Sequence, residues 1–310
     1  MSKSVMPSGT QMNNLLSPKQ VGLALGLSES SIKRYCDQGV LNSVRTLGGH
    51  RRLTLNEVLQ FVKNRRQAIV SPSALGLSTR SLGSEIDIES GVVSLFEALL
   101  NGNEDSVRQI VNDLYLAGNP ISRICDRLIC PVFRRIGARW ASLAIDVYQE
   151  RRSCELMQLT LHGLRTMLKE PDQEWIACGG TLEGDHYAIP NTMVELVLRE
   201  ALWNASSLGI AVPCQSMAKA LTDMKPKLFW LSVSHIPDDD EFIEQIDHLS
   251  HHAEKLKTVF VMGGRALNQA MLRRLPNHSF LICESMQQLE TLALQLRRVG
   301  TAGPVEEALA

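Results

Sequence analysis

The sequence lacks the short motifs that mark the common enzyme classes. It contains no phosphate-binding P-loop, no nucleophile paired with a base and no cluster of metal ligands. Its seven cysteines are scattered without a C-x-x-C pair, which argues against a disulfide framework or a zinc site and indicates reduced thiols in the cytoplasm. There is no run of about 18 apolar residues, as a transmembrane helix would need. Residues 1–14 also lack the apolar core of a signal peptide.

Charge is divided unevenly along the 310-residue chain. Residues 1–66 contain ten Lys and Arg against three acids, a formal charge of +7, whereas the remainder contains 22 basic and 30 acidic residues, a formal charge of -8. A basic N-terminal module on an acidic body indicates nucleic acid as a partner at one end. A solvated basic face is the alternative that charge alone leaves open.

Composition and periodicity predict a multidomain chain of the α and α/β classes. The predicted segments are a disordered tail over 1–14, a compact helical module over 15–66, a linker over 67–88, a four-helix bundle over 89–170, a doubly wound, Rossmann-like α/β domain over 171–298 and a second tail over 299–310. Within the α/β domain, the pattern predicts a helix over 192–205 and then a strand over 210–213.

Two short helices are predicted at the start of the basic module. Ser17 is a cap followed by Pro18 at the first helical position, and Ser28 caps a second helix that Gly39 closes. Two short helices joined by a tight turn form a helix-turn-helix. The second helix leaves four polar side chains available to DNA: Ser30, Ser31, Lys33 and Arg34.

A basic hairpin follows these helices. Two glycines in LGGHRRL predict a tight turn, and the basic residues behind it can reach phosphates or a minor groove. The candidate contacts are Arg45, His50, Arg51 and Arg52. Together, SxxxVGLALGLSESSIKRYCDQGVL and RTLGGHRRL resemble the winged helix-turn-helix of the MerR superfamily, in its short BldC-like or excisionase-like branch, which implies binding to double-stranded DNA. A helical bundle with surface arginines is the alternative.

A second resemblance rests on spacing in the α/β domain. Asp185 to Pro190 is followed by 41 residues, then Ser232-Val233-Ser234, then 28 residues, then Gly263-Gly264. This resembles the cobalamin-binding pattern D-x-H-x-x-G, S-x-L, G-G, with Tyr187 at the position of the cobalt-ligating His and Pro190 at that of the Gly. The candidate cofactor residues are Asp185, His186, Tyr187, Ser232, Ser234, Gly263 and Gly264. Small residues at strand ends leave room for a nucleotide-like tail.

The bundle adds a shorter motif. Trp140 is followed by nine residues and then Glu150, which resembles the W-x9-E-H motif of the CarH/LitR light-sensing regulators, where a bundle helix covers the upper face of cobalamin. Arg151 replaces the His of that motif. The resemblance implies that Trp140 and Glu150 contact a cofactor, whereas a Trp on a bundle helix can also be ordinary core.

These resemblances imply a DNA-binding, homo-oligomeric transcription regulator of the CarH/LitR type with an altered sensor. Cobalamin without the His ligand, another tetrapyrrole or small molecule, or an empty pocket all remain open as the state of that sensor. A corrinoid carrier of a methyltransferase system and an antirepressor that acts on a protein partner are the alternative functions. The operator, the direction of regulation and any light dependence are not determined by the sequence.

Overall fold

The computed structural model describes residues 15–46, 48–65, 67, 69–75, 88–276 and 280–300. The chain forms two compact units, Met1–Glu85 and Ile86–Ala310. The predicted tail over 1–14 and residues 76–87 of the predicted linker lie outside the described residues. The last helix continues to Gly300, so the predicted second tail begins too early, and residues 301–310 lie outside the described part.

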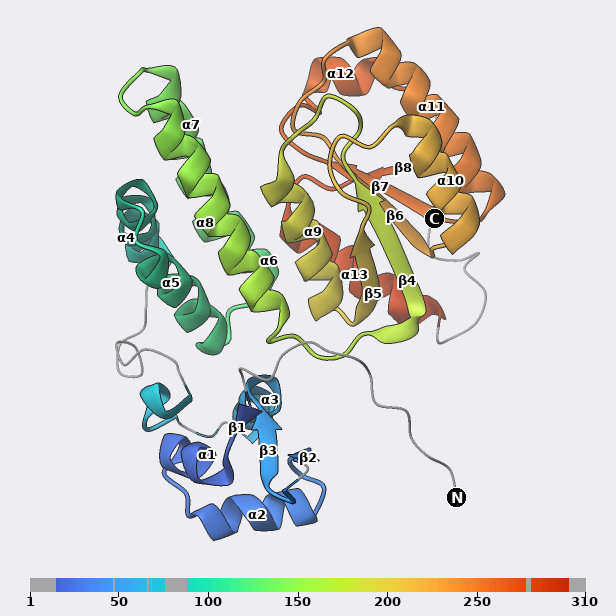
Figure 1. The fold of residues 1–310 in the computed structure, drawn as a ribbon. Helices are drawn as coiled ribbons and strands as arrows, with labels where there is room; N and C mark the ends of the chain where they lie inside the picture. Colours follow the sequence, from blue (N-terminus) through green and yellow to red (C-terminus); the bar gives the residue numbers. More distant parts are fainter. Residues whose placement is uncertain are drawn as a thin grey trace. The chain divides into compact units, whose positions relative to one another are not determined.

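The N-terminal unit combines short helices with a three-stranded antiparallel sheet of order β1-β3-β2 (Figure 1). Its elements are β1 (Leu15–Leu16), α1 (Pro18–Leu25), α2 (Glu29–Asp37), β2 (Val44–Arg45), β3 (Arg51–Thr54), α3 (Leu55–Arg65) and a 3-10 turn over Pro72–Leu75. The α1–α2 pair and the β2–β3 hairpin confirm the predicted winged helix-turn-helix fold.

Local signals set the bounds of α1 and α2. The Ser17 hydroxyl accepts from the Gln20 N–H at 3.2 Å and the Gln20 side chain accepts from the Ser17 N–H at 2.9 Å, which forms a capping box. Gly26 ends α1 with a φ of 65°, a left-handed conformation that favours glycine. The Ser28 hydroxyl caps α2 by accepting from the Ser31 N–H at 3.1 Å.

Residues 69–75 pack within the N-terminal unit. The N–H groups of Val70 and Ser71 both donate to the Ala24 carbonyl, at 2.7 and 3.0 Å, and Ile69 and Leu75 are buried. The predicted linker over 67–88 therefore begins too early. Its Ser- and Gly-rich composition concealed two apolar side chains that anchor the segment.

The C-terminal unit begins with a helical bundle (Figure 1). Its helices are α4 (Ile88–Asn101), α5 (Glu104–Leu116), α6 (Ile121–Ile124), α7 (Cys130–Ala141) and α8 (Val147–Arg165). A π-helical turn over Cys125–Ile129 joins α6 to α7, so that 121–141 is one continuous helix. This arrangement confirms the predicted bundle.

A parallel five-stranded sheet follows the bundle, with helices on both faces (Figure 1). Its elements are β4 (Asp172–Gly180), α9 (Ala188–Glu200), β5 (Trp203–Ser207), α10 (Cys214–Met224), β6 (Leu228–Ser232), α11 (Asp239–Lys255), β7 (Val259–Gly263), α12 (Gln269–Arg274), β8 (Phe280–Ile282) and α13 (Met286–Gly300). The order β5-β4-β6-β7-β8 confirms the predicted doubly wound fold. Its topological switch point lies between β4 and β6, and ligands bind such sheets beyond the carboxyl ends of those strands.

The second strand of this sheet differs from the prediction. Helix α9 ends at Glu200 and β5 covers Trp203–Ser207, whereas the sequence predicted a helix over 192–205 and a strand over 210–213. Leu202 adopts a φ of 66°, which ends the helix. Trp203 is fully buried and stacks edge-on against Trp175 at 5.0 Å between ring centroids. Short apolar runs fit both helix and strand, so periodicity could not place this boundary.

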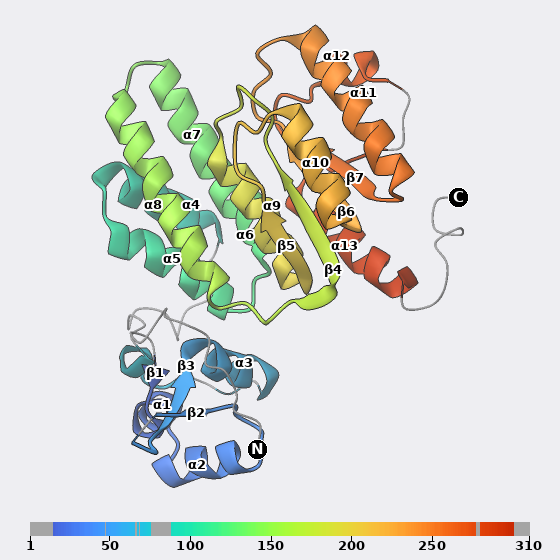
Figure 2. The same cartoon turned by 45° about the vertical axis from the view of Figure 1, so that its right-hand side comes forward.

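Polar contacts join the bundle to the α/β domain. Figure 2 shows α8 beside α9, where the Arg165 guanidinium lies 2.8 Å from the Glu195 carboxylate. On the π-helical turn, the Asp126 carboxylate accepts from the N–H groups of Met286 and Gln287, each at 3.0 Å. Asp126 therefore caps α13 from another domain.

The Asp126→Ala substitution should lower the free energy of unfolding by about 1 kcal/mol, because it removes the cap of α13. Urea denaturation of the full chain, followed by circular dichroism, measures this change. Asp223→Ala is the control, since the exposed pair of Asp223 with Lys219 on α10 contributes no more than about 0.5 kcal/mol. Equal losses in both variants would contradict a stabilising cap at Asp126.

Candidate functional site

The predicted DNA-contacting residues of α2 differ in how free their side chains are. The hydroxyls of Ser30 and Ser31 each lie 2.8 Å from the hydroxyl of Ser28, within the cap of the helix. The Lys33 ammonium group forms an ion pair with the Glu29 carboxylate, one turn earlier on α2, at 2.7 Å. Arg34 is exposed and has no acidic partner among the described residues. Arg34 is therefore the α2 cation most available to a phosphate or a base.

The hairpin between β2 and β3 forms the wing. The Thr46 N–H donates to the His50 carbonyl at 2.9 Å, and the Gly49 N–H donates to the Thr46 carbonyl at 2.8 Å. Gly49 has a φ of 76°, which explains the glycine at this turn. Arg45 and His50 are exposed on the wing, whereas Leu47 lies outside the described residues.

Arg51, predicted as a phosphate contact, instead ties the wing to α2. Its guanidinium donates to the Asp37 carboxylate and to the Lys33 carbonyl, the latter at 2.9 Å. The side chain of Arg51 is only 18% exposed, and its hydrogen bond lowers the pKa of Asp37. Arg52 is half-buried, and its guanidinium donates to the Arg51 carbonyl at 3.1 Å. Sequence reasoning missed the Asp37 partner because the two residues belong to different elements.

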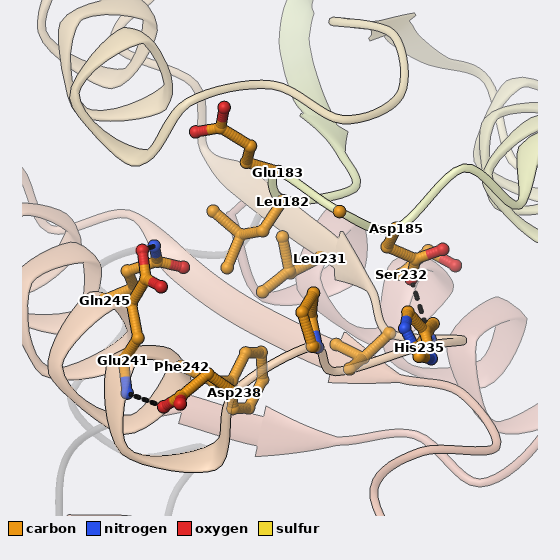
Figure 3. A pocket seen from close by; sticks show the side chains of 13 residues that line it. Leu182, Glu183, Asp185, Leu231, Ser232, His235, Asp238, Glu241, Phe242 and Gln245 are labelled. Atoms are coloured by element: carbon orange, nitrogen blue, oxygen red, sulfur yellow. Dashed lines mark hydrogen bonds between the residues drawn. The ribbon is translucent and has the colours of Figure 1, made fainter.

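In the C-terminal unit, Asp185 joins the two loops that flank the switch point. It is 2% exposed. One carboxylate oxygen accepts from the Tyr187 N–H at 3.1 Å, and the other accepts from the N–H groups of Ser234 and His235 at 2.6 and 3.1 Å. Figure 3 shows Asp185 and His235 facing each other across this edge of the sheet. Asp185 thus acts as a clamp between the loops after β4 and β6.

A cavity of about 240 Å³ lies beside this clamp, toward the start of α11 (Figure 3). Leu231 and Phe242 line it with buried apolar surface, while Glu183, Asp238 and Glu241 are exposed acids at its edge. An acidic edge disfavours an anionic group such as a phosphate. The predicted cofactor residues that line the cavity are Asp185 and Ser232.

Tyr187, at the position of the expected metal ligand, is half-exposed at the start of α9. The guanidinium of Arg265 lies over its ring, 4.3 Å from the ring centroid, in a cation–π contact. Arg265 is held there by donating through Nε to the Ser234 carbonyl at 3.0 Å. His186 is exposed on the same loop. Sequence reasoning missed Arg265, although it directly follows the predicted glycine pair.

The predicted small residues, Gly263 and Gly264, serve packing between loops. Gly264 has a φ of 136°, and a Cβ there would collide with the backbone of Val233. A Cβ on Gly263 would collide with the Cys283 carbonyl. Ser232 and Ser234 are 4% and 7% exposed. Close backbone packing therefore accounts for both glycines, and their predicted role beside a ligand tail stays a prediction.

The buried side chain of Trp230, two residues before Ser232 on β6, packs on the face of the sheet that α9 covers. Trp230 is 1% exposed, and its Nε1–H donates to the Asn191 side chain on α9 at 2.8 Å. Its ring packs over Gly179 on the neighbouring strand, where any Cβ would collide with it. Asn191 in turn donates to the Ser207 hydroxyl at 2.7 Å. This network closes the sheet against α9.

The predicted bundle residues lie at the α7–α8 end. Trp140 is 48% exposed, so it is not a core residue. Glu150 lies 3.4 Å from Arg151 and accepts from the Cys154 thiol at 3.4 Å. Among the described residues, no hydrogen bond, ion pair or ring contact joins Trp140 or Glu150 to Asp185 or Tyr187. The structure thus connects Asp185, Tyr187 and Ser234 at the crevice beyond the carboxyl ends of β4 and β6. It does not join Trp140 or Glu150 to that crevice through any of these contacts.

Metal ligation has little support in the described part of the chain. There, no group of three or more His, Cys, Asp or Glu side chains is arranged to hold a metal ion. All seven cysteines are free thiols, and burial raises the pKa of Cys178 to about 12 and those of Cys214 and Cys283 to about 11. Such thiols stay protonated near neutral pH and bind metals poorly. No described helix has the length and apolarity that crossing a membrane requires.

Two family models match the chain. Residues 15–66 match a helix-turn-helix domain, and residues 93–163, within the bundle, match a B12 binding domain. The first match covers the winged module, and the second covers the helices that precede the sheet.

Two similar proteins span more of the chain. The HTH-type transcriptional repressor CarH of Myxococcus xanthus is 22% identical over 290 residues, which cover 84% of this chain and 91% of the repressor. The monomethylamine corrinoid protein of Methanosarcina barkeri superposes with a TM-score of 0.57 at 17% identity and covers 68% of this chain and 100% of its own; this likeness shows the fold alone. The chain is therefore a CarH-like protein, distantly homologous to the Myxococcus repressor, in which a helix-turn-helix domain precedes B12-binding-type domains.

Proposed function

We propose that this chain is a sequence-specific DNA-binding transcription regulator without enzymatic activity. The observation that carries this proposal is the exposed Arg34 on α2, beside a wing that Arg51 holds in place, within a module of formal charge +7. A helix presented in this way enters the major groove of duplex DNA. The exposed wing residues Arg45 and His50 contact the adjacent backbone.

Arg34 and Arg51 have different roles in this proposal. Arg34 pairs with a phosphate, so its loss removes one counterion-release event. The Arg51 guanidinium donates its hydrogen bonds to the Asp37 carboxylate and the Lys33 carbonyl. Arg51 therefore affects DNA binding by positioning the wing and not by contacting a phosphate. Ser30 and Ser31 belong to the cap of α2, and they and Lys33 share this helix with Arg34, so we propose them as further contacts to DNA.

Salt dependence separates the two roles. Arg34→Ala should reduce the slope of log K against log salt concentration by about 0.9, whereas Arg51→Ala should weaken binding with little change in slope. Fluorescence anisotropy with a duplex selected from a random pool measures both. Unchanged affinity in both variants would contradict the assignment of residues 15–66 to DNA binding. A slope reduced by about one in Arg51→Ala would show that Arg51 contacts a phosphate directly.

Cobalamin is the ligand that the B12-binding family implies for the C-terminal unit, but the crevice does not fit its His-ligated form. Residue 187 offers a phenol beneath the Arg265 guanidinium, in place of an imidazole, which donates a lone pair in its neutral form. The cavity that Asp185 and Ser232 line has exposed acids at its edge, Glu183, Asp238 and Glu241, and no imidazole from position 187. We propose that the domain holds another tetrapyrrole or small molecule, or serves as a scaffold for self-association.

Absorption spectra test this part of the proposal. Titration with adenosylcobalamin should give no His-ligated spectrum with the wild-type chain, because no imidazole stands at position 187. Tyr187→His is the gain-of-function variant, and Leu159→His, which adds an imidazole at an exposed position of α8, is the control. Binding gained only in Tyr187→His would mean that the pocket persists without its ligand. Tight wild-type binding with light-dependent release of DNA would contradict the proposal.

We also propose that the chain binds DNA as a homo-oligomer. One winged module offers a small footprint, and pairing two modules raises affinity through effective concentration. The α7–α8 end exposes four large apolar side chains that can form a contact between copies: Trp140, Leu143, Val147 and Tyr148.

Light scattering tests this proposal directly. The wild-type chain should have at least twice the monomer mass, and Leu143→Glu should reduce it, because Leu143, 90% exposed, is the most exposed of these four apolar side chains. Leu294→Glu on α13, where the side chain is 41% exposed, is the control. A wild-type monomer both free and on DNA would rule out self-association.

A further inference from the structure

One helix of the bundle has an exposed face rich in arginine. The continuous helix over 121–141 contains five arginines and a single acid. All five arginines are exposed. We refer to them as the arginine face: Arg123, Arg127, Arg134, Arg135 and Arg139.

The arginine face has no acidic partner. None of its members forms an ion pair with an acid among the described residues, in contrast to Arg108 on α5, which pairs with Glu104 and Asp105. The one acid on the same helix, Asp126, spends its carboxylate on the N–H groups at the start of α13. The helix therefore keeps a formal charge of +4 on a body whose overall charge is negative.

The π-helical turn divides the arginines into two groups along the helix. Arg123 and Arg127 lie before and within that turn, and Arg134, Arg135 and Arg139 follow it on α7. Arg135 and Arg139 lie one turn apart, with guanidinium groups 4.2 and 6.0 Å from the ring centroid of Phe96 on α4. From first to last, the arginines extend about 24 Å along the helix axis, the length of about seven base pairs of duplex DNA.

The chemistry of the face favours phosphates over a protein partner. Protein interfaces have an apolar centre, whereas the exposed large hydrophobic side chain of this helix, Trp140, lies at its end, beyond Arg139. Guanidinium groups bind phosphate oxygens in a bidentate manner. The N-terminal module would bring DNA to the same chain and so raise the local concentration of phosphates.

We propose that the arginine face is a second, sequence-independent contact with the DNA backbone. This inference rests on the proposed function, since the winged module delivers the duplex. The module reads sequence, while the arginine face adds electrostatic affinity that does not depend on sequence. Arg127 and Arg134 are the members for testing, because neither stacks on Phe96 or forms an ion pair among the described residues.

The test compares two full-length variants by fluorescence anisotropy over a series of salt concentrations. The DNA is a random-sequence duplex of about 40 base pairs, on which binding is governed by phosphate contacts. The double variant Arg127→Gln/Arg134→Gln should reduce the slope of log K against log salt concentration by about 1.8. The control Arg108→Gln removes an arginine that is already paired on the same bundle, so it should leave the slope unchanged. Thermal denaturation verifies that both variants fold.

The outcomes separate this inference from the proposed function. A slope reduced in Arg34→Ala but unchanged in the double variant would leave the module assignment intact and overturn the arginine face. A slope reduced in the double variant but unchanged in Arg34→Ala would support the arginine face and remove only Arg34 from the phosphate contacts, since the module itself is tested by its affinity for the selected duplex. An unchanged slope with a lower mass in light scattering would show that the arginine face joins copies of the chain, which also overturns the inference.

Discussion

The clamp formed by Asp185 is the interaction on which the crevice depends. A buried carboxyl group is costly unless its oxygens accept hydrogen bonds, and here they accept three backbone N–H groups from two loops. These bonds set the positions of Tyr187 and His235 directly. They also set the position of Arg265, because its guanidinium donates a hydrogen bond to the carbonyl of the same Ser234. The pattern that suggests a cofactor site thus begins with a residue that also organises the protein backbone.

Much of the fold could be predicted from the sequence because its signals are local. The capping residues Ser17 and Ser28 and the left-handed Gly26 bound the helices of the winged module within a few positions. Short apolar runs alternating with amphipathic helices indicated the doubly wound α/β domain, although not the order of its strands. The prediction failed at β5, since the left-handed Leu202 that follows the helix and Trp203 at the start of the strand share the short apolar run 201–203, which periodicity could not divide.

The candidate site was less predictable because its contacts join residues far apart in the chain. Nothing near Tyr187 indicates that Arg265 stacks on it, and nothing near Arg51 indicates that Asp37 engages it. Both arginines belong to runs that resemble ligand-binding motifs. Their partners, and not their residue types, decide whether they contact a ligand or hold the protein together. The glycine pair at 263–264 illustrates the same point, because close backbone packing and ligand binding both demand glycine.

The π-helical turn at Cys125–Ile129 couples the bundle to the sheet domain. It presents Asp126 to the first turn of α13, so the bundle forms part of a helix end that belongs to the sheet domain. Moving the bundle away from the sheet would uncap α13, at a cost of about 1 kcal/mol. A cost of this size shifts the balance toward the closed arrangement by a factor of about five, so a ligand that needs an open unit would bind that much more weakly.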